Sequence, residues 1–160
     1  MDIEIVKIEK PRDMNMILGQ THFIKTVEDL YEAMVNISTN VRFGIAFCEA
    51  SADCLVRCEG NDPGLKELAA QNAFRLGCGH CFIILLAEAY PINFLNAIKM
   101  VPEVCNIYCA TANDVEVVVA KTDMGRGILG VIDGLKTRGI ESDTDVEKRE
   151  HIIRKIGYKR

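Results

Sequence analysis

A helix that ends at a glycine and runs directly into an apolar strand, between Asn61 and Ala87, constrains the fold of this chain most. Asn61-Asp62-Pro63 combines an Asx residue that can cap a helix with proline at the first helical position. Apolar residues then recur at helical spacing as far as Gly77, where a glycine can end the helix. The run Cys81–Ala87 is apolar throughout, as strands of parallel sheets usually are. The segment therefore predicts a helix packed on a buried sheet.

Further helices and strands alternate along the chain. Helices are predicted from Thr26, where Thr26-x-x-Asp29 resembles a capping box, from Pro91 to Pro102, and from Thr144 or Asp145 to Gly157. Strands are predicted at 3–8, 14–20, 41–48, 54–59, 104–110, 115–121 and 128–132. We expect the first two strands to pair. The alternation predicts an α/β fold: one domain over residues 1–160, a layered sandwich with a mixed β-sheet covered by helices.

Charge and hydropathy exclude several classes of protein. The chain has 160 residues with 19 basic and 23 acidic ones, and its net charge is −4. It contains no basic block, so we expect no nucleic-acid partner. The longest apolar run, Cys81–Ala87, is far shorter than the roughly 20 residues of a membrane span. The start of the chain, with Asp2 and Glu4, is not that of a signal peptide, and the predicted location is the cytoplasm.

Cys78-Gly79-His80-Cys81 has the spacing of a redox dithiol in an unsuitable place. Redox C-x-x-C pairs precede a helix, whose N-terminal end favours the thiolate, whereas this motif follows a helix and enters a strand. Structural zinc is disfavoured too, because the second cysteine pair, Cys105 and Cys109, lies on a predicted strand at a spacing of about 13 Å. Most of the seven cysteines are expected to pack as small hydrophobic side chains.

His80 is the candidate active-site group of that motif. Gly79 would let the backbone approach a ligand, and an imidazole can act as a base or nucleophile near neutral pH. The alternative is a histidine that is simply hydrogen-bonded in the core.

The stretch Gly125–Gly130 matches G-x-G-x-x-G. A strand rather than a helix follows it, so the pattern differs from that of dinucleotide-binding folds and predicts a glycine loop between two strands. The amides of Gly125 and Gly127 could approach phosphate oxygens, and Arg126 could add a bidentate contact. The alternative is a hairpin with glycine at positive φ. No Walker A lysine motif and no G-x-S-x-G motif is present.

Other polar residues lie where the predicted strands and helices end. Glu49 follows an apolar strand and is a candidate base or metal ligand, and Asn113 holds a similar position after another strand. Asn93 interrupts an apolar helix and can cap it or bind a ligand. Asp133 is a candidate Mg²⁺ ligand, because Mg²⁺ usually takes one or two carboxylates together with phosphate. Glu49 and Asp133 each also have a structural alternative as a turn residue.

Six blocks of the chain, taken in order, resemble the adenosine-specific kinase family. They are Phe43–Ser51, Gly77–Phe82, Pro91–Lys99, Val101–Cys105, Cys109–Asn113 and Gly125–Gly134. The resemblance implies an α/β protein with helices layered on a sheet, assembled as a homo-oligomer, with a trimer favoured. It implies binding of adenosine or AMP and suggests phosphoryl transfer. The family's glycine-framed histidine corresponds to His80, its strand-end acid to Glu49, and its glycine loop supplies Arg126 and Gly127.

These observations lead to one hypothesis and two alternatives. The chain is predicted to be an adenosine- or AMP-binding phosphotransferase that uses ATP or AMP, with Mg²⁺ as the cofactor. His80 would act as a base or accept a phosphoryl group, Arg126 would neutralise phosphate charge, and Asn113 would contact ribose or adenine. The first alternative is a non-catalytic adenine-nucleotide sensor or regulatory protein. The second is a thiol oxidoreductase.

Overall fold

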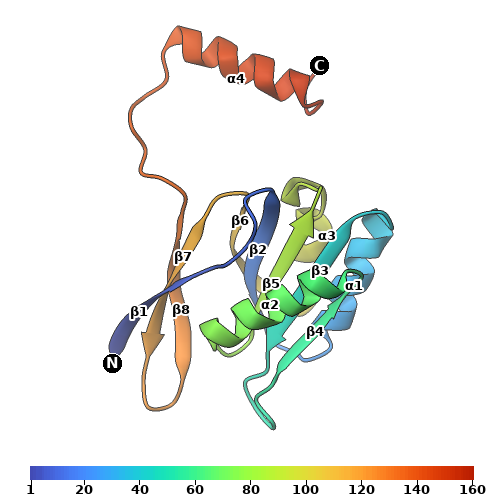
Figure 1. Cartoon of the computed structure of the whole chain (residues 1–160), viewed down its shortest axis with the longest axis vertical. Coiled ribbons are helices and arrows are strands. Elements are labelled where there is room, and N and C mark those ends of the chain that lie inside the picture. Colours follow the sequence, from blue (N-terminus) through green and yellow to red (C-terminus); the bar gives the residue numbers. More distant parts are fainter.

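The computed structural model describes residues 1–160, and it contains eight strands, four α-helices and a 3₁₀ helix (Figure 1). In chain order the elements are β1 (Asp2–Lys7), β2 (Met14–Thr21), α1 (Thr26–Ile37), β3 (Arg42–Cys48), β4 (Val56–Gly60), α2 (Pro63–Leu76), β5 (Cys81–Ala87), the 3₁₀ helix η1 (Pro91–Asn93), α3 (Leu95–Lys99), β6 (Val104–Thr111), β7 (Val115–Lys121), β8 (Arg126–Asp133) and α4 (Asp143–Lys155). The α/β class is confirmed, and helices form at each predicted place, although the helix predicted from Pro91 to Pro102 is divided into η1 and the short α3. No helix is both long enough and apolar enough to cross a membrane.

The strands form two sheets, and every strand pair is antiparallel. Five strands lie in the order β4-β3-β5-β2-β6, and three lie in the order β1-β7-β8. The prediction of a mixed sheet with parallel strands was therefore wrong. It followed from the continuous apolar run Cys81–Ala87, which reflects burial on both faces rather than strand direction.

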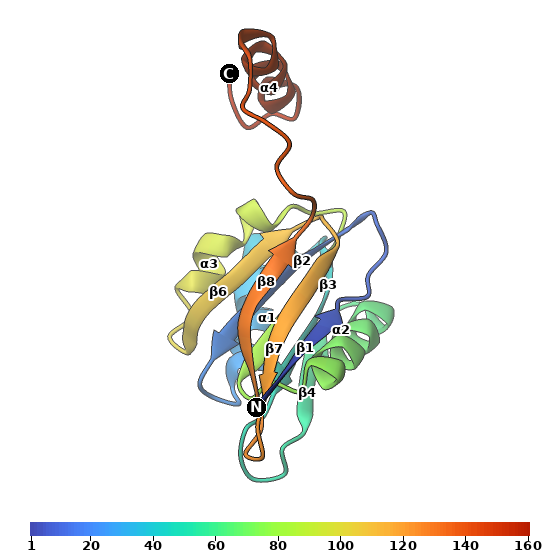
Figure 2. The ribbon, with the colours of Figure 1, turned by 90° about the vertical axis from the view of Figure 1, so that its left-hand side faces the viewer.

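Both faces of the five-stranded sheet are covered (Figure 2). Ile84 and Leu86 of β5 pack with Leu30 of α1 and Ile98 of α3. The alternate residues of β5 face the other way, and there they pack with α2 and with the valines of β7. The result is three layers, with α2 and the three-stranded sheet side by side in one outer layer.

The expected pairing of the first two strands is also wrong. β1 pairs with β7, from Asp2 opposite Lys121 to Lys7 opposite Glu116. β2 lies between β5 and β6, so both of its edges are already hydrogen-bonded within the larger sheet. The first strand therefore joins the smaller sheet.

Local signals located the helix boundaries with mixed success. At α2 the Asp62 side chain accepts the Leu65 N–H at 3.0 Å, and Gly77 ends the helix in the left-handed conformation (φ +56°), as predicted. At α1 no side chain caps the helix, because the Thr26 hydroxyl is bonded to Thr21 and to the Phe23 carbonyl. At α4 the capping box is made by Ser142 with Asp145, rather than by a Thr144 or Asp145 cap.

Helix α4 stands apart from both sheets, at the end of the extended segment 134–142 (Figures 1 and 2). None of its side chains is buried. Beyond it, the Tyr158 hydroxyl donates to Asn93 Oδ1 at 3.2 Å, and the Tyr158 ring meets Tyr90 edge-on. The C-terminal end of the chain thereby contacts η1.

Candidate functional site

A cavity of about 630 Å³ lies where three segments meet at one end of the molecule. These segments are the turn between β3 and β4, the C-terminal end of α2 with the residues after it, and the hairpin between β7 and β8. They are distant in sequence and lie side by side in Figures 1 and 2. The volume is in the range of small-molecule binding sites.

Five of the residues singled out from the sequence line this cavity: Glu49, Gly79, Gly125, Arg126 and Gly127. They came from three unrelated sequence arguments, namely a strand end, a glycine-framed histidine and a glycine motif. The fold brings them to one place.

Arg126 is the cation of the cavity. It begins β8, opposite Lys121 of β7, and its Nη1 lies 3.0 Å from Glu4 Oε2. Its Nε is buried and has no hydrogen-bond partner in the chain. The side chain as a whole is 25% exposed, so its positive charge favours an anionic ligand in the cavity that it lines.

Glu49 places a carboxylate in the same cavity. Its Oε2 accepts the Leu55 N–H at 3.2 Å and a bond from Arg57 Nη2 at 3.0 Å, while no partner within the chain is bonded to Oε1. The Leu55 N–H, together with the Arg57 guanidinium, holds the pKa of Glu49 below its ordinary value. A charged carboxylate of this kind suits a cation ligand or a hydrogen-bond acceptor better than a general base at neutral pH.

The rest of the lining includes apolar side chains that the sequence analysis did not assign. Leu55 and Val56 come from the turn and start of β4, Phe74 from α2, and Met124 from the hairpin. Phe74 is 78% exposed although it lies on a helix. It falls outside the apolar stripe of that helix. An aromatic residue at such a position is the sequence signal that could have identified Phe74 as a binding residue.

The glycine motif is not a loop. β8 begins at Arg126, so Gly127 and Gly130 lie within a strand, and only Gly125 belongs to the hairpin turn. None of the three has positive φ. The alternative of a hairpin is therefore confirmed, because β7 and β8 are antiparallel neighbours, but the expected positive φ at glycine is wrong. A Cβ added at Gly125 or Gly127 would meet nothing within 4 Å, so these residues leave open space at the cavity.

His80 contributes its backbone near the cavity and its side chain elsewhere. Its N–H donates to the Cys48 carbonyl at 2.8 Å, and its φ of +62° is left-handed. Its ring stacks on Phe47, with centroids 5.8 Å apart, and Phe47 belongs to the core on the α1 side of the sheet. The imidazole therefore lies on the opposite side of the sheet from Arg126, whereas Glu49 is bonded to Arg57, the residue opposite Phe47 on β4. Gly79 is required by a close approach to Ala50, whose Cβ would lie 2.9 Å from a Cβ added at Gly79.

Asp133 and Asn113 lie at the far end of β8, roughly 24 Å along the strand from Arg126. Asp133 Oδ1 accepts hydrogen bonds from Thr111 at 2.8 Å and from Asn113 at 2.9 Å. No group of three or more histidine, cysteine or carboxylate side chains is arranged to hold a metal ion. Because of its distance from Arg126, Asp133 does not fit an Mg²⁺ site shared with that residue, and Asn93, bonded to Tyr158, is also outside the cavity.

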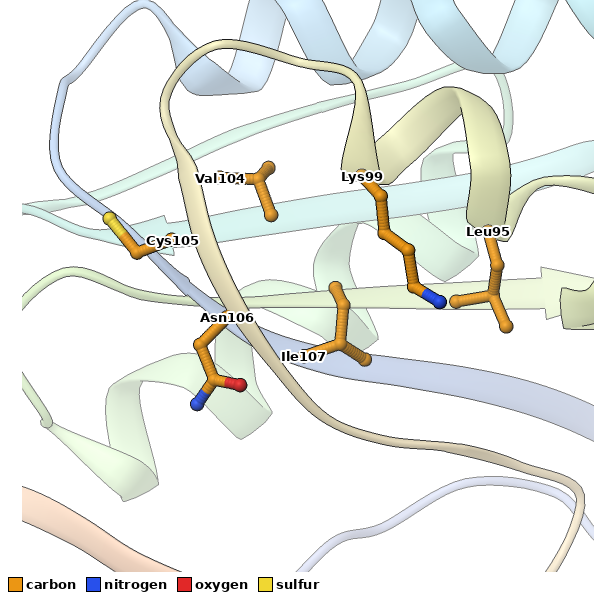
Figure 3. Close-up of a pocket in the computed structure, with 6 residues that line it drawn as sticks. All are labelled: Leu95, Lys99, Val104, Cys105, Asn106 and Ile107. Atoms are coloured by element: carbon orange, nitrogen blue, oxygen red, sulfur yellow. The ribbon is translucent and has the colours of Figure 1, made fainter.

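A second cavity, of about 430 Å³, runs along β6 and α3 (Figure 3). Lys99 is its one charged residue, beside Leu95 and the start of β6. None of the candidate catalytic, nucleotide-binding or metal residues lines it. The first cavity is therefore the candidate site.

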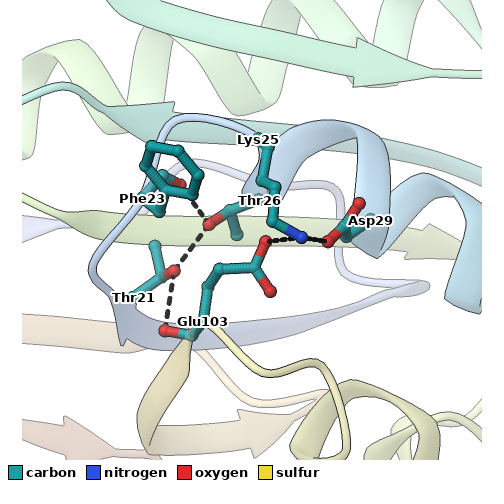
Figure 4. A network of polar contacts seen from close by, with 6 residues as sticks. All are labelled: Thr21, Phe23, Lys25, Thr26, Asp29 and Glu103. Atoms are coloured by element: carbon teal, nitrogen blue, oxygen red, sulfur yellow. Dashed lines mark hydrogen bonds and ion pairs between the residues drawn. The ribbon is translucent and has the colours of Figure 1, made fainter.

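A polar network at the start of α1 has a structural role (Figure 4). Lys25 Nζ lies 2.9 Å from Oε1 of the buried Glu103 and also pairs with Asp29. The Thr21 hydroxyl donates to the Glu103 carbonyl at 2.9 Å. These contacts fasten α1 to the segment that leads into β6.

Comparisons with known proteins agree with the resemblance seen in the six sequence blocks. A family model described as "Adenosine specific kinase" matches residues 6–159. Among solved structures, the chain is similar to the crystal structure of the PH1918 protein from Pyrococcus horikoshii OT3. The two share 46% sequence identity over 99% of this chain and 98% of that one, with a TM-score of 0.95. No curated protein matches the chain.

Proposed function

Because the chain belongs to the adenosine specific kinase family, we propose that it binds adenosine or AMP in the cavity between the β3–β4 turn, α2 and the β7–β8 hairpin, and transfers a phosphoryl group there. The observation that carries the proposal is the meeting of Glu49, Gly79 and Arg126 with an apolar wall in one cavity. An apolar wall with a few convergent polar groups is the usual composition of a nucleoside site.

In this proposal the adenine base lies against the apolar wall. Leu55, Phe74 and Met124 offer flat or flexible apolar surface, and an exposed aromatic ring can stack on a purine. The phosphate of AMP, or the phosphoryl group in transfer from ATP, faces Arg126. The partly exposed guanidinium would stabilise negative charge that develops on the phosphate oxygens.

Glu49 is the residue that would hold Mg²⁺, because its carboxylate is charged at neutral pH and Oε1 has no partner within the chain. When bound with ATP, Mg²⁺ neutralises charge on the phosphates. His80 enters the proposal through its backbone alone, which bonds the Cys48 carbonyl at the cavity wall.

The proposal predicts selectivity for adenine compounds. In calorimetric titrations of the full chain, we expect adenosine and AMP to bind at least tenfold more tightly than guanosine. Adenine and guanine carry different hydrogen-bond donors and acceptors on their edges, so a site that pairs with adenine would leave polar atoms unpaired when guanine binds. Guanosine bound as tightly as adenosine would contradict the assignment of the substrate.

A non-catalytic nucleotide sensor is the alternative, and one observation favours it. The cavity contains no group placed as a neutral-pH base, because the pKa of Glu49 is lowered and His80, whose ring stacks on Phe47, does not line the cavity. Product formation from adenosine and ATP, followed by chromatography, separates the two functions. Turnover supports the kinase, whereas tight binding without turnover supports the sensor.

We also propose that the chain is a homo-oligomer, with a trimer favoured, in the cytoplasm. Apolar side chains are exposed on edge strand β8 and beyond it, among them Leu129, Leu135 and Ile140. Such a surface is typical of an interface. Sedimentation equilibrium is expected to give three times the chain mass of 17.8 kDa, and a monomer would contradict this part of the proposal. The cytoplasmic assignment is supported by seven cysteines that are all unpaired.

A further inference from the structure

Cys48 and Cys81 form a close pair of thiols on neighbouring strands. β3 and β5 are antiparallel, with Phe47 opposite Phe82, so the next residue of β3 faces the residue before Phe82. The two Sγ atoms lie 3.6 Å apart. The C-x-x-C partner, Cys78, instead directs its thiol to the Leu76 carbonyl at 3.3 Å. The close pair therefore differs from the one that the sequence motif suggests.

The geometry of the pair is near that of a disulfide. A disulfide needs an S–S distance of about 2.05 Å and Cβ atoms about 3.5–4.5 Å apart. Directly opposed residues of antiparallel strands already have Cβ atoms about 4.5–5.5 Å apart. Small side-chain rotations and a slight approach of the strands would close the bond, without rearrangement of the sheet.

The two thiols differ in access and in acidity. Cys48 is 5% exposed and lines the cavity, which is the route by which a small solute would approach it, whereas Cys81 is 2% exposed and does not line the cavity. Cys81 donates its S–H to Cys48, and this bond together with burial raises the pKa of Cys81. The same bond lowers the pKa of Cys48 by stabilising its thiolate. Cys48 is therefore the attacking sulfur and Cys81 the resolving one.

We propose that Cys48 and Cys81 are a peroxide-reactive pair that forms a reversible disulfide in the wall of the cavity. The Cys48 thiolate attacks one oxygen of hydrogen peroxide, the O–O bond breaks, and the hydroxide released takes up the proton from Cys48 as water. The Cys81 sulfur then attacks the sulfenic acid on Cys48. An S–S bond forms, the S–O bond breaks, and hydroxide leaves with the Cys81 proton as a second water. Two thiols are oxidised and one peroxide is reduced.

The test is peptide mapping of the folded protein after exposure to hydrogen peroxide. Trypsin would leave Cys48 with Cys54 in Phe43–Arg57, and Cys78 with Cys81 in Leu76–Lys99. The Cys54→Ser, Cys78→Ser double variant therefore makes the assignment unambiguous. After free thiols are alkylated in denaturant, we expect the two peptides to be cross-linked, and dithiothreitol to separate them. Peptides that stay separate, or a cross-link that forms only in denaturant, would overturn the proposal.

Cys81→Ser provides the matched control. Without the resolving thiol, Cys48 should accumulate as a sulfenic acid that dimedone traps, and no cross-link should form. A Cys48–Cys78 or Cys78–Cys81 cross-link in the unsubstituted chain, in place of the expected one, would also contradict the assignment. An unchanged circular dichroism spectrum shows that each variant is folded. Since none of these measurements involves a nucleotide, their outcome is independent of the proposed function.

Discussion

Arg126→Ala is expected to weaken AMP binding about 10- to 100-fold and to leave adenosine binding nearly unchanged. Hydrogen bonds to charged groups contribute about 1.5–3 kcal/mol, and adenosine has no phosphate to form them. The Arg126 side chain is 25% exposed and is the one cation that lines the cavity, so we expect it to be the group that contacts the phosphate. Calorimetric titration of both compounds into the variant and the unsubstituted chain measures the difference.

Lys99→Ala is the control for that experiment. It removes a cation from the second cavity, along α3 and β6, and should change neither affinity. Arg126→Ala also removes the ion pair with Glu4, a partly exposed pair expected to contribute at most about 1 kcal/mol to stability. Equal losses for adenosine and AMP would mean that Arg126 does not contact phosphate.

Gly44→Ala is expected to lower the free energy of unfolding by about 3 kcal/mol, at the upper end of overpacking effects. A Cβ at Gly44 would lie 2.2 Å from the Leu65 carbonyl carbon, 2.3 Å from its oxygen and 2.3 Å from the Lys66 nitrogen. These are backbone atoms of α2, so the whole helix would have to move away from β3. Urea denaturation followed by circular dichroism measures the effect.

Gly64→Ala, in helix α2 itself, is the matched control. There the nearest atom to an added Cβ is Asp62 Oδ1, at 3.4 Å, and alanine is the better helix former. We expect Gly64→Ala to be neutral or to stabilise by up to about 1 kcal/mol. If Gly44→Ala unfolded at the same urea concentration as the unsubstituted chain, α2 would not be packed on β3 as described. Because α2 carries Phe74 and leads to Gly77, the Gly44 variant should also bind adenosine less tightly.

The features predictable from sequence were those set by neighbouring residues. Helix α2 has its cap, its proline and its terminal glycine within one short segment, and both ends were predicted correctly. Strand pairing depends on partners far along the chain. The β1–β7 pair and the antiparallel direction of β5 follow from how two sheets share one core, and no local pattern reports this.

In the candidate site too, some features could be predicted from neighbouring residues and others depend on the fold. Glu49 was selected as an acid at a strand end and Arg126 as the cation of a glycine motif, and the fold brings both to one cavity. The side-chain direction of His80 depends on a left-handed backbone and on stacking against Phe47, neither of which the sequence specifies. Cys48 and Cys81 are 33 residues apart, so the pair becomes visible only once β3 and β5 are aligned.

A crystal structure of the chain with AMP bound would test the location of the nucleotide site most directly. We expect AMP in the cavity beside Leu55 and Phe74, with a phosphate oxygen within hydrogen-bonding distance of Arg126. AMP bound in the groove along β6, or against the His80 ring on the other side of the sheet, with the Arg126–Glu4 ion pair unchanged, would contradict it.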